Sequence, residues 1–168
     1  STLFPYTTLF RSSAATSNQD INVDIEGDLP TTCGSDFIIT VTNMNIFNEI
    51  DNGSAYGPKS IDLGAYGEDV FSIYPNNAYR NFRGTSAAAP QVSGAIALLY
   101  ATPCSNLSTL AKLNPSAAAL EVKKIILDFS KPNADLKGKT VSGGVLNLFR
   151  SVNSLTPLDL IQTTTNSF

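Results

Sequence analysis

The chain has 168 residues, of which 42% are hydrophobic and 15% are charged, and its net charge is −3 at pH 7. This composition is typical of one globular domain with its own core, and it excludes a disordered chain. We also expect no nucleic-acid partner and no membrane span, because the chain is acidic and has no long apolar run. Histidine is absent, so these residues cannot supply an imidazole base to any reaction.

The first twelve residues, STLFPYTTLFRS, follow neither a helical nor a strand period. They also lack the basic region and the unbroken apolar core of a signal peptide. The string matches an in-frame translation of a common sequencing adapter. We therefore expect residues 1–12 to be an artefact, 13–153 to be the folded part, and 154–168 to be a tail or linker.

The next segments predict short strands separated by loops. Residues 13–31 are polar and predict a loop, whereas the β-branched run at 37–41 predicts a strand buried on both faces. A second short strand is expected at 61–63. Apolar residues on both sides of a Pro-Asn-Asn turn predict a hairpin over 70–82.

Three helices follow in the sequence. Residues 86–100 are rich in Ala and Leu and uncharged, which predicts a buried helix. Asn114 and Pro115 are a cap and a first helical residue, and the spacing of the apolar residues after them predicts an amphipathic helix to 129. A short closing helix is expected at 145–152. Strands followed by helices indicate an α/β fold.

Ser86 stands where the predicted hairpin gives way to the buried helix. The unpaired N–H groups of a helix N-terminus can stabilise the oxyanion that forms when a serine attacks a carbonyl. Gly84 permits a special backbone conformation and the close approach of a substrate strand. The alternative is a Ser/Thr cap on an ordinary core helix, which Thr85-Ser86 alone would favour.

The longer string GTSAAAPQVSG resembles the nucleophile motif of the subtilisin-like serine peptidases. It departs from that motif at Ala87, Ala89 and Gln91. Three further stretches, at 54–57, 61–67 and 142–147, resemble other segments of the family in the same order. The matching positions of the motif are Gly84, Thr85, Ser86, Ala88, Pro90, Val92 and Gly94.

The resemblance implies part of a subtilisin-like fold, with a mostly parallel sheet flanked by helices and a buried helix that starts at Ser86. It implies a secreted endopeptidase that forms an acyl-enzyme on Ser86 and acts on peptides or proteins, with Gly84 and Thr85 lining the substrate's approach. The triad Asp and His precede the serine in this family, so we expect them in a missing N-terminal half and expect this fragment to be inactive alone.

The resemblance also suggests supporting residues. The family's oxyanion amide corresponds to Asn18, with Thr16 as the alternative, although the usual glycine is missing. Asn18 is otherwise an ordinary solvated loop asparagine, and both interpretations stay open here. Two cysteines alone cannot form a structural zinc site, so Cys33 and Cys104 are either two buried thiols or a disulfide, as in some related enzymes. We identify no cofactor: calcium is common in the family, but no carboxylate cluster here has ligand spacing.

Two other functions stay open at this point. A sedolisin-like peptidase uses Glu and Asp instead of His, although the motifs after Ser86 fit the subtilisin pattern better. A degenerate family member could instead be a binding module. The sequence upstream of this chain would discriminate them, as would labelling of Ser86 by an active-site serine probe.

Overall fold

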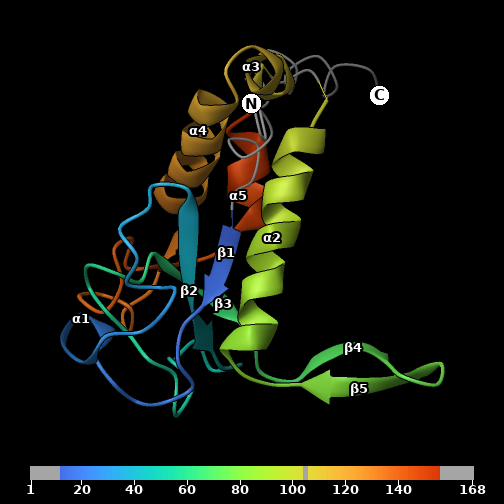
Figure 1. Cartoon of the computed structure of the whole chain (residues 1–168). Helices are drawn as coiled ribbons and strands as arrows, with labels where there is room; N and C mark the ends of the chain where they lie inside the picture. Colours follow the sequence, from blue (N-terminus) through green and yellow to red (C-terminus); the bar gives the residue numbers. More distant parts are fainter. Residues whose placement is uncertain (1–11, 104–105, 156–168) are drawn as a thin grey trace, which may run out of the picture.

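The computed structural model describes residues 12–103 and 106–155 (Figure 1). Its main sheet has the strand order β1-β2-β3-β7-β6. The first four of these strands are parallel, and β6 is antiparallel at the edge. The α/β fold with a mainly parallel sheet is confirmed. The elements are β1 (Ser12–Ala15), α1 (Val23–Glu26), β2 (Ile38–Met44), β3 (Leu63–Tyr66), β4 (Val70–Tyr74), β5 (Ala78–Phe82), α2 (Thr85–Ala101), α3 (Leu107–Leu113), α4 (Pro115–Asp128), β6 (Lys131–Pro132), β7 (Gly144–Val145) and α5 (Leu148–Asn153).

The core lies between the sheet and the helices. Ile39, Val41 and Leu63 are completely buried in one cluster with residues of α2 and α4. Thr40 and Thr42 alternate with the apolar residues of β2 and are buried on its other face. Their hydroxyls donate hydrogen bonds to backbone carbonyls of the segment before β3. Strand β2 is therefore buried on both faces, as predicted.

Helix α4 begins as the sequence predicts. Asn114 Oδ1 accepts a hydrogen bond from the N–H of Ala117, and Pro115 occupies the first turn. Val122 and Ile126 are completely buried on its apolar face, whereas Phe129, just beyond its end, is 37% exposed. The predicted helix is thus one residue too long, because the apolar spacing continues past the last helical residue.

Replacing Ile126 by alanine is expected to lower the free energy of unfolding by about 2–5 kcal/mol, because a buried cavity replaces its side chain. The matched control is Leu120→Ala on the same helix, where the leucine is 44% exposed and the loss should stay below about 1 kcal/mol. Urea unfolding of the full-length protein measures both losses. Equal losses would contradict the burial of α4 against the sheet.

The expectation of a loop over 13–31 is wrong at two places. Strand β1 occupies 12–15 and pairs in parallel with β2, although its small residues have low strand propensity; tertiary pairing outweighs that propensity. Helix α1 begins at Val23, where Asn22 caps it. A one-turn helix has too few residues to show a period, so the sequence gives no signal for it.

Other elements also differ from the prediction. Strand β3 starts at Leu63, later than expected, and helix α5 starts at Leu148, because Val145 pairs in β7 and Asn147 caps the helix. Helix α3 was not predicted. Helix α2 is not buried all round: Val92 faces the core, but Leu98 on the opposite side is 44% exposed.

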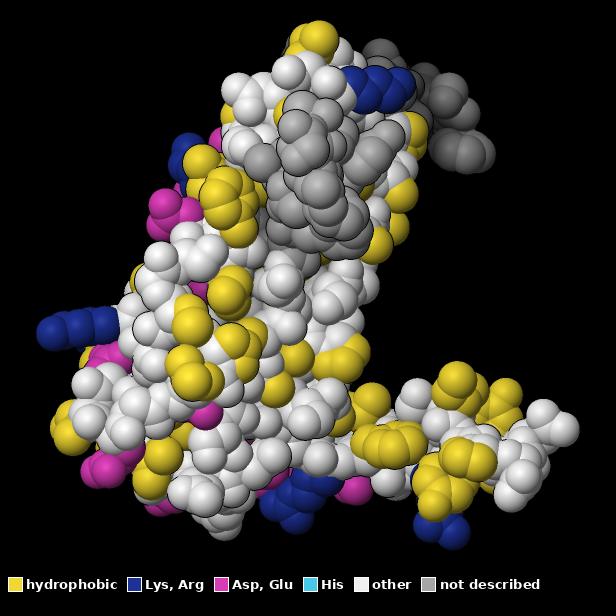
Figure 2. All heavy atoms as spheres, viewed as in Figure 1, with side chains coloured by type: hydrophobic (Ala, Val, Ile, Leu, Met, Phe, Trp, Pro, Cys, Tyr) yellow, Lys and Arg dark blue, Asp and Glu magenta, His cyan; other side chains and the backbone are white. Residues whose placement is uncertain are grey.

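The β4–β5 hairpin forms as predicted and projects away from the rest of the chain (Figure 1). Figure 2 shows hydrophobic side chains gathered on this arm. Phe71 stacks on Tyr79 with ring centroids 5.4 Å apart, yet both are more than half exposed. The hairpin therefore carries apolar surface that the described residues do not cover.

Candidate active site

Ser86 lies in the first turn of α2, just after the hairpin. Gly84 is the N-cap, with φ +106° and ψ 178°, a conformation that is open almost only to glycine. Thr85 is completely buried, and its hydroxyl donates to the carbonyl of Thr16 at 2.6 Å. Thr85 thus anchors the turn, and the next side chain, Ser86, is exposed to solvent.

Asn18 lies beside this turn, although 67 residues separate it from Thr85. Asn18 Oδ1 accepts the N–H of Thr85 at 3.1 Å, and it lies at the same distance from the hydroxyl of Thr85, whose one proton it shares with the carbonyl of Thr16. Two contacts at one oxygen fix the plane of the amide, and Nδ2 has no acceptor among the described residues. The N–H of Ser86 also has no intrahelical acceptor at this position. Asn18, which contacts the turn, and Ser86, which belongs to it, therefore each offer an N–H donor without an acceptor among the described residues.

The two candidates for the oxyanion amide are placed differently. Thr16 is 4% exposed, and its hydroxyl donates to Asp28 Oδ2 at 3.0 Å. The one proton of this hydroxyl is therefore already bound to a carboxylate. Asp28 Oδ2 also accepts the N–H of Ser17. The structure brings Asn18, rather than the hydroxyl of Thr16, to the turn that carries Ser86.

Replacing Gly84 by alanine is expected to cost about 1–3 kcal/mol of stability, because of its backbone conformation. An added Cβ would also lie 2.9 Å from Asn18 Oδ1. The control is Gly94→Ala inside α2, where no atom lies within 4 Å of the added Cβ and alanine is the better helix former. Thermal unfolding of the full-length protein compares the two; a neutral Gly84→Ala change would contradict the turn described here.

A cavity of about 260 Å³ opens beside Ser86, between α2 and the hairpin. Its walls are mainly apolar, with Arg83 on one side. The residues that line it are Val70, Ser72, Phe82, Arg83, Ser86, Ala87 and Pro90. The serine hydroxyl therefore borders a space large enough for a side chain from elsewhere.

One glycine near the site was predicted only as part of a motif. The carbonyl of Gly67 accepts the N–H of Gly84 at 2.9 Å. An added Cβ at Gly67 would lie 2.5 Å from the carbonyl oxygen of Gly84 and 2.8 Å from the N–H nitrogen of Ala88. Only a glycine allows this approach, so the end of β3 packs directly on the start of α2.

Other residues that the sequence singled out lie elsewhere. Asp62, in the motif stretch 61–67, is buried and pairs with Lys123 at 2.9 Å, away from Ser86. Cys33 is exposed, so the alternative of two buried thiols is wrong for this cysteine. Cys104 lies outside the described residues, so the Cys33–Cys104 disulfide stays a prediction, as does the adapter origin of residues 1–12, of which only Ser12 is described, as the first residue of β1.

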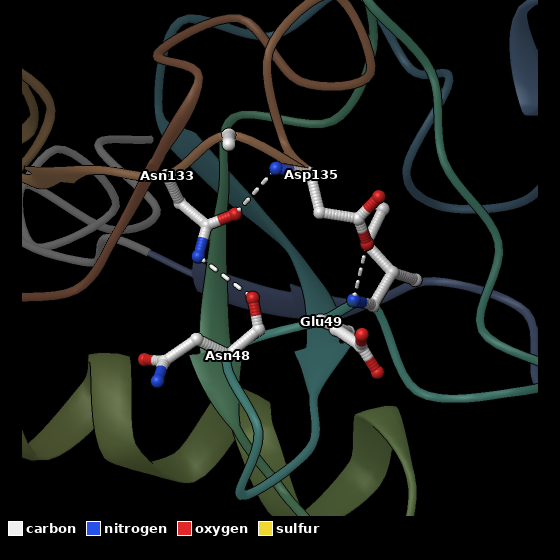
Figure 3. A pocket seen from close by; sticks show the side chains of 6 residues that line it. Asn48, Glu49, Asn133 and Asp135 are labelled. Atoms are coloured by element: carbon white, nitrogen blue, oxygen red, sulfur yellow. Dashed lines mark hydrogen bonds between the residues drawn. The ribbon is translucent and has the colours of Figure 1, made fainter.

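A second cavity, of about 680 Å³, lies on the surface where the chain after β2 meets the segment after β6 (Figure 3). Asn133 Nδ2 donates to the carbonyl of Asn48 at 2.8 Å, and Asp135 Oδ2 accepts the N–H of Ile50 at 2.7 Å. Hydrogen bonds from Lys139 and then from Ile50 lower the pKa of Asp135 below its ordinary value of 3.8. These hydrogen bonds hold the two loops together, and none of the described residues that line the cavity is a serine, threonine or cysteine.

Asp135→Asn is expected to lower stability at pH 7 by about 0.2–1 kcal/mol, the range for exposed ion pairs. Because the folded state lowers the pKa of Asp135, its contribution is present above pH 3.8 and is lost as the pH falls through the lower, folded pKa. The variant and the parent should therefore converge near pH 2 in urea unfolding. Asp20→Asn, at an exposed carboxyl, is the control and should show no such convergence.

Within residues 12–103 and 106–155, no three His, Cys, Asp or Glu residues are grouped so as to hold a metal ion. Across the same residues, the helices are too short or too polar to cross a membrane.

Comparisons with known proteins agree on one family. Residues 11–142 match the model described as Subtilase family. Subtilisin-like protease 2 of Plasmodium falciparum (isolate 3D7) is 33% identical over 134 residues, which are 80% of this chain and 10% of that protein. The Major intracellular serine protease of Bacillus subtilis (strain 168) is 44% identical over 62 residues, 37% of this chain and 19% of that protein.

Solved structures share the fold. The prenylagaramide maturation protease PagA has a TM-score of 0.65 and 25% identity, with 86% of this chain and 50% of that chain covered. The A-subunit of the AB5 toxin from E. coli has a TM-score of 0.69 and 20% identity, with the same coverage. The chain therefore spans about half the length of these structures and a much smaller share of the curated relatives.

Proposed function

Because the chain belongs to the subtilase family of serine peptidases, we propose that it is the nucleophile-bearing part of a secreted endopeptidase with Ser86 as the nucleophile. The observation that carries the proposal is the exposed Ser86 at a helix N-terminus, with Asn18 held against the same turn. Its substrates are peptides or proteins, cleaved within the chain.

The reaction follows from these groups. Ser86 Oγ attacks the carbonyl carbon of the scissile bond and gives its proton to a histidine base. The carbonyl oxygen becomes an oxyanion, which the N–H of Ser86 and Asn18 Nδ2 stabilise. The base then protonates the leaving amine, the C–N bond breaks, and water later hydrolyses the acyl ester on Ser86.

The histidine and its aspartate come from a part of the protein outside these 168 residues, which contain no histidine. Two features support this arrangement. The cavity between α2 and the hairpin opens on Ser86 and is where a base can reach the hydroxyl. The exposed apolar residues of α2 and the hairpin, such as Leu98 and Phe71, offer the surface on which such a part can pack. Alone, these residues should be inactive, because an unactivated serine is a weak nucleophile.

Labelling by a fluorophosphonate probe tests the proposal. The full-length protein, which includes the part that supplies the histidine and the aspartate, should be labelled. Peptide mapping should place the adduct on Ser86. A chain limited to residues 12–155 should stay unlabelled at the same probe concentration. Full-length protein that stays unlabelled while folded would reject the enzyme and favour a binding module.

Secretion is a separate part of the proposal, drawn from the family. A relative in Bacillus subtilis is named an intracellular protease, so location varies among relatives. Immunodetection in culture medium and in cell extract tests the secretion. A secreted protein should be found in the medium, and a protein confined to the extract would overturn the proposed secretion.

A further inference from the structure

A group of polar residues outside the predicted site holds the segment that leads into Ser86. We propose that Arg83, Asp51 and Asn43 are positioning residues, which fix the turn formed by Gly84, Thr85 and Ser86 relative to the sheet. This inference rests on the proposed peptidase function, but its structural part can be tested without activity.

The first contact is a two-fold ion pair. Arg83 Nε and Nη2 donate to the two carboxylate oxygens of Asp51 at 3.0 and 2.6 Å. Such a paired contact fixes the direction of the guanidinium as well as its distance. The hydrogen bonds and the charge of Asp51 raise the pKa of Arg83 above its ordinary value. The side chain of Asp51 is 7% exposed and that of Arg83 is 58% exposed, so a buried carboxylate anchors an exposed guanidinium.

The second contact ties Asp51 to the sheet. Asp51 Oδ2 accepts Asn43 Nδ2 at 2.8 Å, and the N–H of Asp51 donates to the carbonyl of Asn43 at 3.0 Å. Asn43 is 1% exposed in β2, which has neighbours on both sides in the sheet. Its own N–H donates to Ser54 Oγ at 2.9 Å. Asp51 is therefore held by an interior strand at two points: its carboxylate by the side chain of Asn43, and its N–H by the backbone carbonyl of Asn43.

The same asparagine touches the other support of the turn. Asn43 Oδ1 is buried without a hydrogen-bond partner among the described residues, and it lies 2.5 Å from where a Cβ of Gly67 would be. Gly67 in turn holds the N–H of Gly84. The segment before Ser86 thus has two supports: Asp51 holds the side chain of Arg83, and Gly67 holds the backbone of Gly84. Both supports meet at Asn43.

This arrangement matters because a nucleophile that is misplaced by about 1 Å can lose about 10²-fold in rate. Asp51→Asn keeps the shape of the side chain but replaces one acceptor by a donor. At the Oδ2 position that donor would face both Asn43 Nδ2 and Arg83 Nε, and at the Oδ1 position it would face Arg83 Nη2, all of which are donors themselves. At least one contact to Arg83 is therefore lost, which weakens this support of the turn.

The experiment uses the full-length protein. We expect Asp51→Asn to lower kcat about tenfold and to change KM by less than about threefold, because Asp51 supports the transition-state geometry without lining the cavity beside Ser86. Amide hydrogen exchange over residues 83–88 should become faster. Asp135→Asn is the matched control, since it removes an ion-paired carboxylate in the second cavity, and both readings should stay at the parent values.

Arg83→Lys is a second, milder variant that keeps the inference testable if Asp51→Asn fails to fold. Lysine keeps the charge at this exposed position but cannot make two parallel contacts, so kcat should fall about fivefold with normal thermal unfolding. Unchanged kcat and unchanged amide exchange in both variants would overturn the inference. A rise in KM alone in Arg83→Lys would also overturn it, because Arg83 would then be a substrate contact. If the parent protein is inactive and unlabelled, the proposed function fails, and faster exchange in Asp51→Asn still supports the structural part.

Discussion

Replacing Ser86 by alanine in the full-length protein is expected to lower kcat for peptide hydrolysis by about 10⁶-fold, the size of loss measured for the nucleophile of a related subtilisin. The reason is that no acyl-enzyme can form without the hydroxyl, whereas binding and the oxyanion donors remain. KM should change little, because Ser86 acts on the reacting bond rather than on the rest of the substrate.

Ser93→Ala is the matched control for this change. Ser93 is also an exposed serine of α2, two turns further along, and its loss should leave kcat within about twofold. Peptide hydrolysis and fluorophosphonate labelling measure the effect independently. If Ser86→Ala kept both, the nucleophile would have to be another residue and the proposed function would be wrong.

The second large effect is expected at Asn18. Loss of one oxyanion donor lowers kcat by about 10²–10³-fold, a magnitude known from a subtilisin. Asn18→Ala should show this loss with KM nearly unchanged, because the oxyanion exists only in the transition state and the intermediate. The comparison of kcat with KM for one peptide substrate gives the measurement.

Asn18→Ala also removes the two hydrogen bonds from Thr85, so a second variant separates the causes. Asn18→Asp keeps an acceptor for Thr85 but has no amide donor, and it should lose activity to at least the same degree. Thr16→Val should be much milder, because that hydroxyl faces Asp28. Full activity in Asn18→Asp, or an equal loss in Thr16→Val, would move the oxyanion donor away from Asn18.

Local sequence signals predicted the elements whose own residues contain a hydrophobic period, a turn motif or a helix cap. The β-branched run of β2, the Pro-Asn-Asn hairpin and the Asn114-Pro115 start of α4 are each set by residues within a few positions. Elements α1 and β1 were missed because the 4 residues of α1 complete no helical period and the Ser and Ala residues of β1 have low strand propensity. Such a strand exists only because β2 offers it a neighbour, and no pattern inside those residues records that neighbour.

The exposed face of α2 shows a different limit. Its sequence is apolar on nearly every side, which predicts burial, but the described chain covers only the face that contains Val92 and Leu99. Hydrophobic pattern reports how much surface a helix needs to bury. It does not report which part of a protein supplies the cover.

The sequence by itself determined the family, the α/β class and the position of Ser86 at the start of a helix, because a motif and its turn are local. The tertiary structure decided the rest of the site. Asn18 meets Thr85 across 67 residues, and Asp51 meets Arg83 across 32. Parallel strands bring their ends to one edge of the sheet whatever the length of chain between them. Contacts made at that edge depend on strand order and register, which no spacing in the sequence encodes.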